Sequence, residues 1–92
     1  MKITFDPVKR AVTLAERGLD FEDAADLFLG DTLDFPDDRQ DYGELRMVTV
    51  GHLNRRMMIV VWTPRGNARH VISMRKANAR EKARFGKRFE EG

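Results

Sequence analysis

The sequence predicts a single α+β domain that occupies residues 1–92. Apolar residues recur at helical spacing through the first third of the chain, and they do so again near its end. Between these stretches, short alternating or wholly apolar segments are separated by turn-forming residues, a pattern that predicts consecutive strands and therefore an antiparallel sheet. The composition, 41% hydrophobic and 35% charged, is typical of a globular protein with a highly charged surface.

The N-terminal region predicts a strand followed by two helices. Residues 2–5 favour a short strand, and Asp6-Pro7 has the order of an N-cap and a first helical proline. Gly18 is placed to end this helix, whose expected core-facing residues are Val8, Ala11, Val12 and Ala15. Asp20 can cap a second helix that ends at Gly30, with an apolar stripe of Ala24, Leu27 and Phe28. We therefore expect an N-terminal αα-hairpin.

The remainder predicts an antiparallel meander and a closing helix. A brief strand is expected at residues 31–35, and a polar loop at 36–43. Further strands are expected at 44–50, 57–62 and 69–75, joined by turns at 51–54 and 63–67. The unbroken apolar run at 57–62 favours a central strand covered on both faces. A C-terminal helix over residues 76–89 would direct Ala77, Ala83, Phe85 and Phe89 to the sheet.

Bulk properties exclude several classes of site. The chain has no cysteine, and His52 and His70 are its only histidines, so we expect neither a structural metal nor a cofactor. No apolar run approaches the ~20 residues that span a bilayer, and no secretory signal pattern is visible. We therefore expect a cytoplasmic protein without a membrane partner.

Charge is distributed unevenly along the chain. Residues 1–44 hold 5 Lys/Arg and 12 Asp/Glu, whereas residues 45–92 hold 12 and 3. Clustered basic residues suggest that the second half meets a polyanion such as RNA, although a solvated charged helix would give the same pattern.

Strand alternation suggests a phosphate site. Arg69, Val71, Ser73 and Arg75 are expected on one face of their strand, with His70, Ile72 and Met74 on the other. Glu44 and Arg46 share a face of a strand that lies one or two strands away, so the four charged residues Glu44, Arg46, Arg69 and Arg75 can converge on one patch of the sheet. Arginine forks suit phosphate oxygens, but cross-strand ion pairs with Glu44 would produce the same spacing.

Metal-free RNA cleavage needs a proton acceptor, a cation and a proton donor. The candidates for proton transfer are Lys9, Glu44, His52, His70 and Lys76. Alternation favours an interior position for His70, and His52 is expected in an exposed turn. Trp62 and Phe85 are expected in the core before any role in base stacking. The basic residues of the last helix either guide RNA or form a solvated face; they are Arg80, Lys82, Arg84, Lys87 and Arg88.

Several segments resemble the BrnT family of toxins. They are Phe-Asp-Pro-Val-Lys at 5–9, Gly-Leu-Asp-Phe-Glu-Asp-Ala at 18–24, Leu-Phe at 27–28, Glu-Leu-Arg at 44–46, Ile-Val-Val-Trp at 59–62, and Arg-His-Val-Ile-Ser-Met-Arg-Lys-Ala at 69–77 with Glu81 beyond. The block at 69–77 is the most specific, and the resemblance spans nearly the whole chain.

This resemblance implies a RelE-like fold and a type II toxin, a metal-independent endoribonuclease that inhibits translation. It also implies a BrnA-like ribbon-helix-helix antitoxin, a heterotetramer of the two proteins, and contact with operator DNA through the antitoxin alone. The matching positions imply catalytic roles for Lys9, Glu44, Arg46, Arg69, Arg75 and Lys76, and RNA contacts for Ser73, Arg80 and Arg84. Lys9 or Lys76 would assist proton transfer, and Glu44 would orient an arginine.

The resemblance departs at the end of the first helix. The family commonly has Asn and Lys-His-Gly there, where this chain has Thr13 and then Glu16-Arg17-Gly18. A histidine is therefore missing, Arg17 supplies only a cation, and activity could be lower. The alternative function is a noncatalytic module that binds RNA or a partner and acts mainly as corepressor with its antitoxin. Growth arrest on expression, relieved by the neighbouring gene's product, would favour the ribonuclease.

Overall fold

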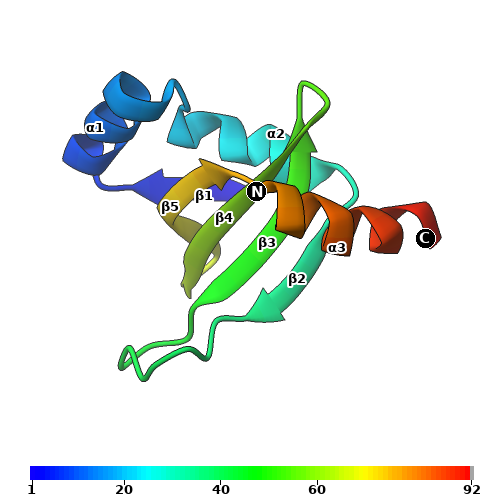
Figure 1. Ribbon diagram of the computed structural model, residues 1–92. Coiled ribbons are helices and arrows are strands. Elements are labelled where there is room, and N and C mark those ends of the chain that lie inside the picture. The colour runs from blue at the N-terminus through cyan, green and yellow to red at the C-terminus, as the bar shows by residue number, and fades with distance from the viewer. Residues whose placement is uncertain (92) are drawn as a thin grey trace.

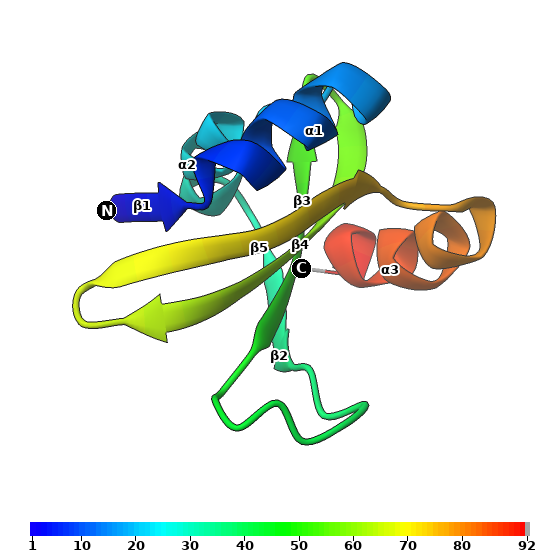
Figure 2. The ribbon, with the colours of Figure 1, turned by 90° about the vertical axis from the view of Figure 1, so that its left-hand side faces the viewer.

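Strand β4 (Arg56–Arg65) lies at the centre of a five-stranded sheet with the order β1-β5-β4-β3-β2 (Figure 1). The computed structural model describes residues 1–91. The other strands are β1 (Lys2–Phe5), β2 (Leu33–Pro36), β3 (Met47–Leu53) and β5 (Ala68–Lys76). Helices α1 (Pro7–Arg17) and α2 (Ala24–Leu29) cover one face, and α3 (Ala79–Glu91) covers part of the other (Figure 2). The predicted α+β class is confirmed.

The sheet is mixed, which corrects the expected all-antiparallel arrangement. Strands β2 to β5 pair antiparallel, but β1 runs parallel to β5, with Lys2 opposite Ala68 and Phe5 opposite Val71. The sequence pattern of a four-residue strand carries no information on the direction of its partner. The edge strand β1 therefore could be located but not oriented from its residues.

Both turns of the meander are shorter than predicted, because the flanking strands extend into them. Gly51 and His52 belong to β3, and the turn is formed by Asn54 and Arg55, whose φ angles are 48° and 68°. Gly51 is needed inside the strand because a Cβ there would lie 2.8 Å from the Leu27 side chain. Thr63 likewise extends β4, where its hydroxyl donates to the Leu45 carbonyl oxygen at 2.6 Å.

Strand β3 begins later than predicted. Glu44 and Arg46 precede its first residue, Met47, so neither has the alternating position expected of it. The reversal from β2 into β3 is instead fixed by the backbone, where the Asp37 amide donates to the Arg46 carbonyl oxygen at 2.8 Å.

Helix α1 has its predicted ends but the opposite orientation. Asp6 accepts from the Val8 amide at 2.9 Å, and Gly18 ends the helix with a φ of 67°. The expected core-facing stripe nevertheless points outward, with Val8 70% and Val12 47% exposed. The inward face is held by charged groups: Arg10 forms two hydrogen bonds of 2.8 and 2.9 Å with Asp20, and Arg17 donates to the Met74 carbonyl oxygen at 2.9 Å.

Asp20 also begins the second helical segment. Its carboxylate accepts from the Glu22 amide at 3.0 Å and starts a 3-10 turn, η1 (Phe21–Asp23), which leads into α2. The hydrogen bonds from Arg10 lower the pKa of Asp20 to about 2, so the carboxylate stays ionised over the physiological range. The expected αα-hairpin is not confirmed, since α1 contacts η1 whereas α2 packs chiefly on β3.

The two faces of the sheet bury separate cores. The core on the α1 and α2 side includes Phe21, Leu27, Met58, Trp62, Val71 and Met74. The core between the sheet and α3 consists of Val50, Met57, Ile59, Ala77 and Phe85, with Phe89 packed against them. Helix α3 starts later than predicted, and Ala83, expected at the sheet, is exposed. The central strand is thus covered on both sides, as its apolar run predicts. Among the described residues, no helix has the length and apolar character to cross a membrane.

These burial differences predict that two apolar truncations change the free energy of unfolding by very different amounts. Leu27→Ala removes a side chain that is 1% exposed, and we expect the free energy of unfolding to fall by about 2–4 kcal/mol. Val12→Ala should change it by no more than about 0.5 kcal/mol because its side chain faces solvent. Urea denaturation of both variants checks this, and equal losses would mean that α1 is oriented with its apolar stripe inward.

Candidate functional site

A β-bulge in β5 determines which side chains meet on each face of the sheet. Val61 of β4 pairs with Ser73, but the next β4 residue, Trp62, pairs with Val71, which leaves Ile72 as an extra residue. Val71 and Met74 consequently both enter the core under α1 and α2, although their odd separation would place them on opposite faces of a regular strand. The bulge therefore reverses the alternation on which the sequence prediction rested.

The predicted convergence of Arg69 with Arg75 is wrong for this reason. Before the bulge, Arg69 points toward α2, where its Cζ lies 4.6 Å from the Phe28 ring centroid and 4.4 Å from that of Trp62. After the bulge, Ser73 and Arg75 point toward α3 and line a cavity there. Alternation about Arg69 and Val71 also places His70 on the α3 side. The bulge thus brings His70, rather than Arg69, to the face that carries Arg75.

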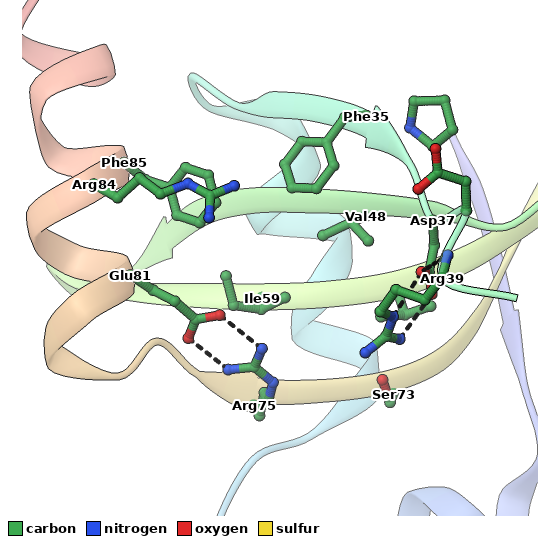
Figure 3. A pocket seen from close by; sticks show the side chains of 13 residues that line it. Phe35, Asp37, Arg39, Val48, Ile59, Ser73, Arg75, Glu81, Arg84 and Phe85 are labelled. Carbon is green, nitrogen blue, oxygen red and sulfur yellow. Dashed lines mark hydrogen bonds and ion pairs between the residues drawn. The ribbon is translucent and has the colours of Figure 1, made fainter.

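The cavity on the α3 side has a volume of about 480 Å³ and lies over the part of the sheet that α3 leaves uncovered (Figure 3). Its floor is apolar and its walls are charged. Strands β2 to β5, the loop after β2, and α3 contribute its lining: Phe35, Pro36, Asp37, Asp38, Arg39, Val48, Ile59, Val61, Ser73, Arg75, Glu81, Arg84 and Phe85.

On one wall, Arg75 is held by the first turn of α3. Its Nη1 and Nη2 atoms donate to the two Glu81 carboxylate oxygens at 2.7 and 2.8 Å. Glu81 also accepts from the Asn78 amide at 2.9 Å, and its own amide donates to the Asn78 side chain at 2.8 Å, which forms a capping box. The hydrogen bonds from Arg75 lower the pKa of Glu81 to about 2. The same pair orients the guanidinium and starts the helix.

On the opposite wall, Arg39 is held by a buried carboxylate. Its Nε and Nη2 atoms each donate to Asp37 at 2.8 Å, and the Tyr42 hydroxyl donates to the same carboxylate at 3.2 Å. The Asp37 side chain is 2% exposed but that of Arg39 is 74% exposed. Arg39 hydrogen bonds lower the pKa of Asp37. Arg39 therefore presents a fixed cation that points toward Ser73 (Figure 3).

Sequence reasoning missed Arg39 because a charged residue in a polar loop has no periodicity that could place it. The nearby charge of Arg39 opposes the pKa rise that the Glu81 hydrogen bonds impose on Arg75, which indicates that the two guanidiniums face a common space. The only available signal was the turn chemistry of the loop itself.

Arg46 lies behind this loop. Its Cζ is 3.9 Å from the Tyr42 ring centroid, and its buried Nε has no hydrogen-bond partner in the described part of the chain. Because Tyr42 also binds Asp37, the Arg46 guanidinium supports the wall that carries Arg39. It does not line the cavity.

A second polar group surrounds His70 at the other end of this face. His70 Nδ1 and Thr4 Oγ1 of the parallel neighbour β1 are 2.8 Å apart. Burial lowers the pKa of His70 below its usual 6.5; the charges of Arg65 and Lys9 act in the same direction, and that of Glu44 opposes them. Glu44 itself lies 3.9 Å from Arg65. Neither Lys9 nor Glu44 lines the cavity that holds Arg75.

The remaining predicted site residues are dispersed. Lys76 lines a different cavity, with His52 and Lys82. Arg84 lines the main cavity, where its Cζ lies 4.8 Å from the Phe85 ring centroid. Arg80 is exposed on α3. Among residues 1–91, no group of three or more His, Asp or Glu side chains is placed to hold a metal ion.

A family model described as "Ribonuclease toxin, BrnT, of type II toxin-antitoxin system" matches residues 5–81. The chain belongs to the BrnT family. A search of curated proteins found no match. Membership makes this chain a ribonuclease toxin of a type II module, which has an antitoxin as its partner. The matched range includes both walls of the cavity, the whole of β5 and the capping box that begins α3.

Arg17 has a structural position in this BrnT-family chain. It occupies the place where the sequence departs from the expected family residues, and it donates to the Met74 carbonyl oxygen in β5. That bond ties α1 to the strand next to the bulge, on the face opposite the cavity.

The Arg75–Glu81 pair makes a contribution to the free energy of unfolding that is lost in acid. The pKa of Glu81 is lowered from 4.5 to about 2, so its contribution is present above pH 4.5 and is lost as the pH falls toward 2. Glu81→Gln, which can keep the helix cap, should remove this contribution of the ion pair. We expect the free energy of unfolding to fall by about 1 kcal/mol at pH 7, allowing for solvent screening of Arg75, whose side chain is 45% exposed.

Thermal unfolding of the wild type and Glu81→Gln between pH 2 and pH 7 measures this contribution, with the exposed Glu90→Gln as the control. The Glu81 difference should shrink as the pH falls below 4.5. A difference that stays constant over the whole range would show that the ion pair does not contribute in this way.

Proposed function

We propose that this toxin is a metal-independent endoribonuclease whose scissile phosphate lies over Ser73, between His70 and Arg75. The observation that carries the proposal is the bulge at Ile72, because it places these three residues on one face of β5. Ser73 and Arg75 are two residues apart, about 6.6 Å along the strand, and His70 lies three residues before Ser73 because of the bulge. We also propose that the sheet and its helices form a RelE-like fold.

Arg75 and Arg39 hold the phosphate in this proposal. A guanidinium has five N–H donors, and each of these two arginines uses two of them on a carboxylate. The remaining donors can reach the nonbridging oxygens, where negative charge increases in the transition state. Because Glu81 and Asp37 already fix the two guanidiniums, little reorganisation accompanies the reaction. Arg84 adds a third cation at the rim.

His70 accepts the proton of the 2′-hydroxyl. In the tautomer that this role requires, Nδ1–H donates to Thr4 Oγ1, so that Nε2 is unprotonated and acts as the base. The lowered pKa favours the neutral ring. The 2′-oxygen then bonds to phosphorus, the bond to the 5′-oxygen breaks, and the products are a 2′,3′-cyclic phosphate and a 5′-hydroxyl. Lys9, whose charge acts on His70, supplies the proton that the 5′-oxygen takes up.

Three predicted catalytic residues take other roles in this account. Arg69 stacks on Phe28 and Trp62 and stabilises the opposite face. Glu44 positions Arg65, and Arg46 supports the loop through Tyr42. Lys76 lines the other cavity and takes no part in the reaction.

The antitoxin partner is proposed to be a BrnA-like ribbon-helix-helix protein that assembles with the toxin as a heterotetramer and contacts operator DNA for both. Cleavage of RNA in the cytoplasm then arrests translation until this antitoxin binds. Family membership supports a partner of the antitoxin class.

Cleavage of RNA in the presence of chelator tests the site directly. We expect Arg75→Gln and His70→Gln each to lower kcat/KM by about 10²-fold or more, because each removes transition-state charge stabilisation or the base. Arg69→Gln is the matched control on the same strand, and we expect less than about threefold change from it. The assignment would be reversed by loss of cleavage in Arg69→Gln with retention in Arg75→Gln.

The pH profile tests the role of His70. A base must be neutral, and a pKa below 6.5 means that His70 loses its proton in mildly acidic solution. We therefore expect kcat/KM to rise with pH through an apparent pKa below 6.5 and then to level off. His70→Gln should lack this rising limb. A wild-type profile that rises only above pH 8 would indicate a lysine as the base instead.

Expression with and without the antitoxin separates enzyme from corepressor. Wild-type toxin should arrest growth, and both the antitoxin and the substitution Arg75→Gln should relieve the arrest. A noncatalytic corepressor would leave growth unchanged in all of these cultures while still strengthening repression of the operon by the antitoxin.

A further inference from the structure

A second basic cavity lies beyond the end of the sheet, outside the proposed active site. Its volume is about 540 Å³. The tip of the β3–β4 hairpin, the last residue of β5 and the first turns of α3 enclose it. Its lining is His52, Arg55, Arg56, Met57, Lys76 and Lys82. We call this set the hairpin-tip pocket.

No described acidic side chain balances the charge of the hairpin-tip pocket. Four of its six lining residues are lysine or arginine, a fifth is His52, and none is acidic. None of these side chains has a carboxylate within 4.0 Å in the described part of the chain, whereas Arg10, Arg39 and Arg75 each have one. Mutual repulsion of clustered cations disfavours such an arrangement unless an anion compensates it. The pocket is therefore suited to an anionic ligand.

The backbone at the hairpin tip supports a role for the Arg55 side chain. Asn54 and Arg55 both have left-handed backbone conformations, with φ angles of 48° and 68°. Such two-residue turns favour glycine at the second position, and a long side chain is uncommon there. Arg55 therefore retains a positive charge at a position where glycine would relieve strain, as expected for a residue that contacts a ligand.

The lining favours a phosphate chain over a protein surface. Met57 is the only apolar residue of the pocket, and at 7% exposure it is buried in the core under α3. A protein partner would need an apolar anchor point, which this pocket does not offer. Phosphodiester groups need only separated cations, which two strands and a helix provide here.

The hairpin-tip pocket adjoins the proposed active site through neighbouring residues. Arg75 and Glu81 line the main cavity, and the residues that follow them, Lys76 and Lys82, line the hairpin-tip pocket. Consecutive Cα atoms are about 3.8 Å apart, so an RNA strand with one phosphate beside Arg75 needs only a few nucleotides to reach the second cavity. We propose that the hairpin-tip pocket binds phosphates of the RNA substrate on one side of the scissile bond. This inference rests on the proposed function and identifies the substrate as an extended single strand.

Binding of an RNA that cannot be cleaved tests the pocket separately from catalysis. The probe is a fluorescent, fully 2′-O-methylated oligomer of about twelve nucleotides, measured by anisotropy at several salt concentrations. We expect Arg55→Gly with Arg56→Gln to raise Kd about tenfold and to lower the salt slope by about 1.4, since each phosphate contact on a single strand contributes about 0.7. Lys2→Gln with Arg69→Gln removes the same charge outside both cavities and should change Kd less than about threefold.

Arg55→Gly alone separates ligand binding from folding. Glycine suits the left-handed turn, so we expect Tm to rise by about 2–6 °C while RNA binding weakens. Cleavage of a dinucleotide, which reaches only the scissile phosphate, should be unchanged in this variant. A structural role for Arg55 would move stability and binding in the same direction.

Three results would overturn the inference: unchanged binding by the double variant, equal weakening in the charge control, or loss of antitoxin binding with RNA binding intact. The last result would assign the pocket to an acidic protein instead. If the wild type cleaves no RNA yet binding depends on Arg55 and Arg56, the proposed function fails while the pocket stands as an RNA site.

Discussion

The single extra residue in β5 is the constraint on which the arrangement of this protein depends. A regular strand would send Val71 and Met74 to opposite faces, but the bulge at Ile72 directs both into the core beneath α1 and α2. The same shift divides the charged residues of the strand. Arg69 stays with the aromatic side chains on one face, and Arg75 faces α3 on the other. One local irregularity thus serves both packing and the proposed chemistry.

Paired arginines give the site its rigidity. Arg10 binds Asp20 and fixes α1 to the segment that begins η1, Arg39 binds Asp37 within the loop after β2, and Arg75 binds Glu81 at the start of α3. Each pair has two parallel hydrogen bonds, a geometry that restricts the guanidinium more than a single contact does. The partly exposed pairs add little to stability. Their main effect is to hold Arg39 and Arg75 on opposite walls of one cavity.

Local chemistry made much of the fold predictable from sequence, whereas long-range pairing did not follow from it. Asp6-Pro7 and Gly18 gave correct ends for α1, and the apolar run before Trp62 correctly predicted the central strand. The outward orientation of Val8 and Val12 depends on where Asp20 and Met74 lie, which periodicity alone does not specify. The bulge depends in turn on how β4 packs against β5. Because the site prediction assumed regular alternation, it paired Arg69 with Arg75 and favoured an interior position for His70. Arg39 was overlooked.

NMR can show directly whether nucleotide binds on the α3 side of the sheet. A 15N-labelled sample would be titrated with a 2′-deoxy dinucleotide while the Arg Nε, His ring and backbone amide signals are recorded. We expect shifts at the Ser73 amide, the His70 ring and the Nε groups of Arg39 and Arg75, with the Arg69 Nε signal unmoved. Shifts confined to Arg69 and the Trp62 indole would place the ligand on the opposite face and contradict binding on the α3 side.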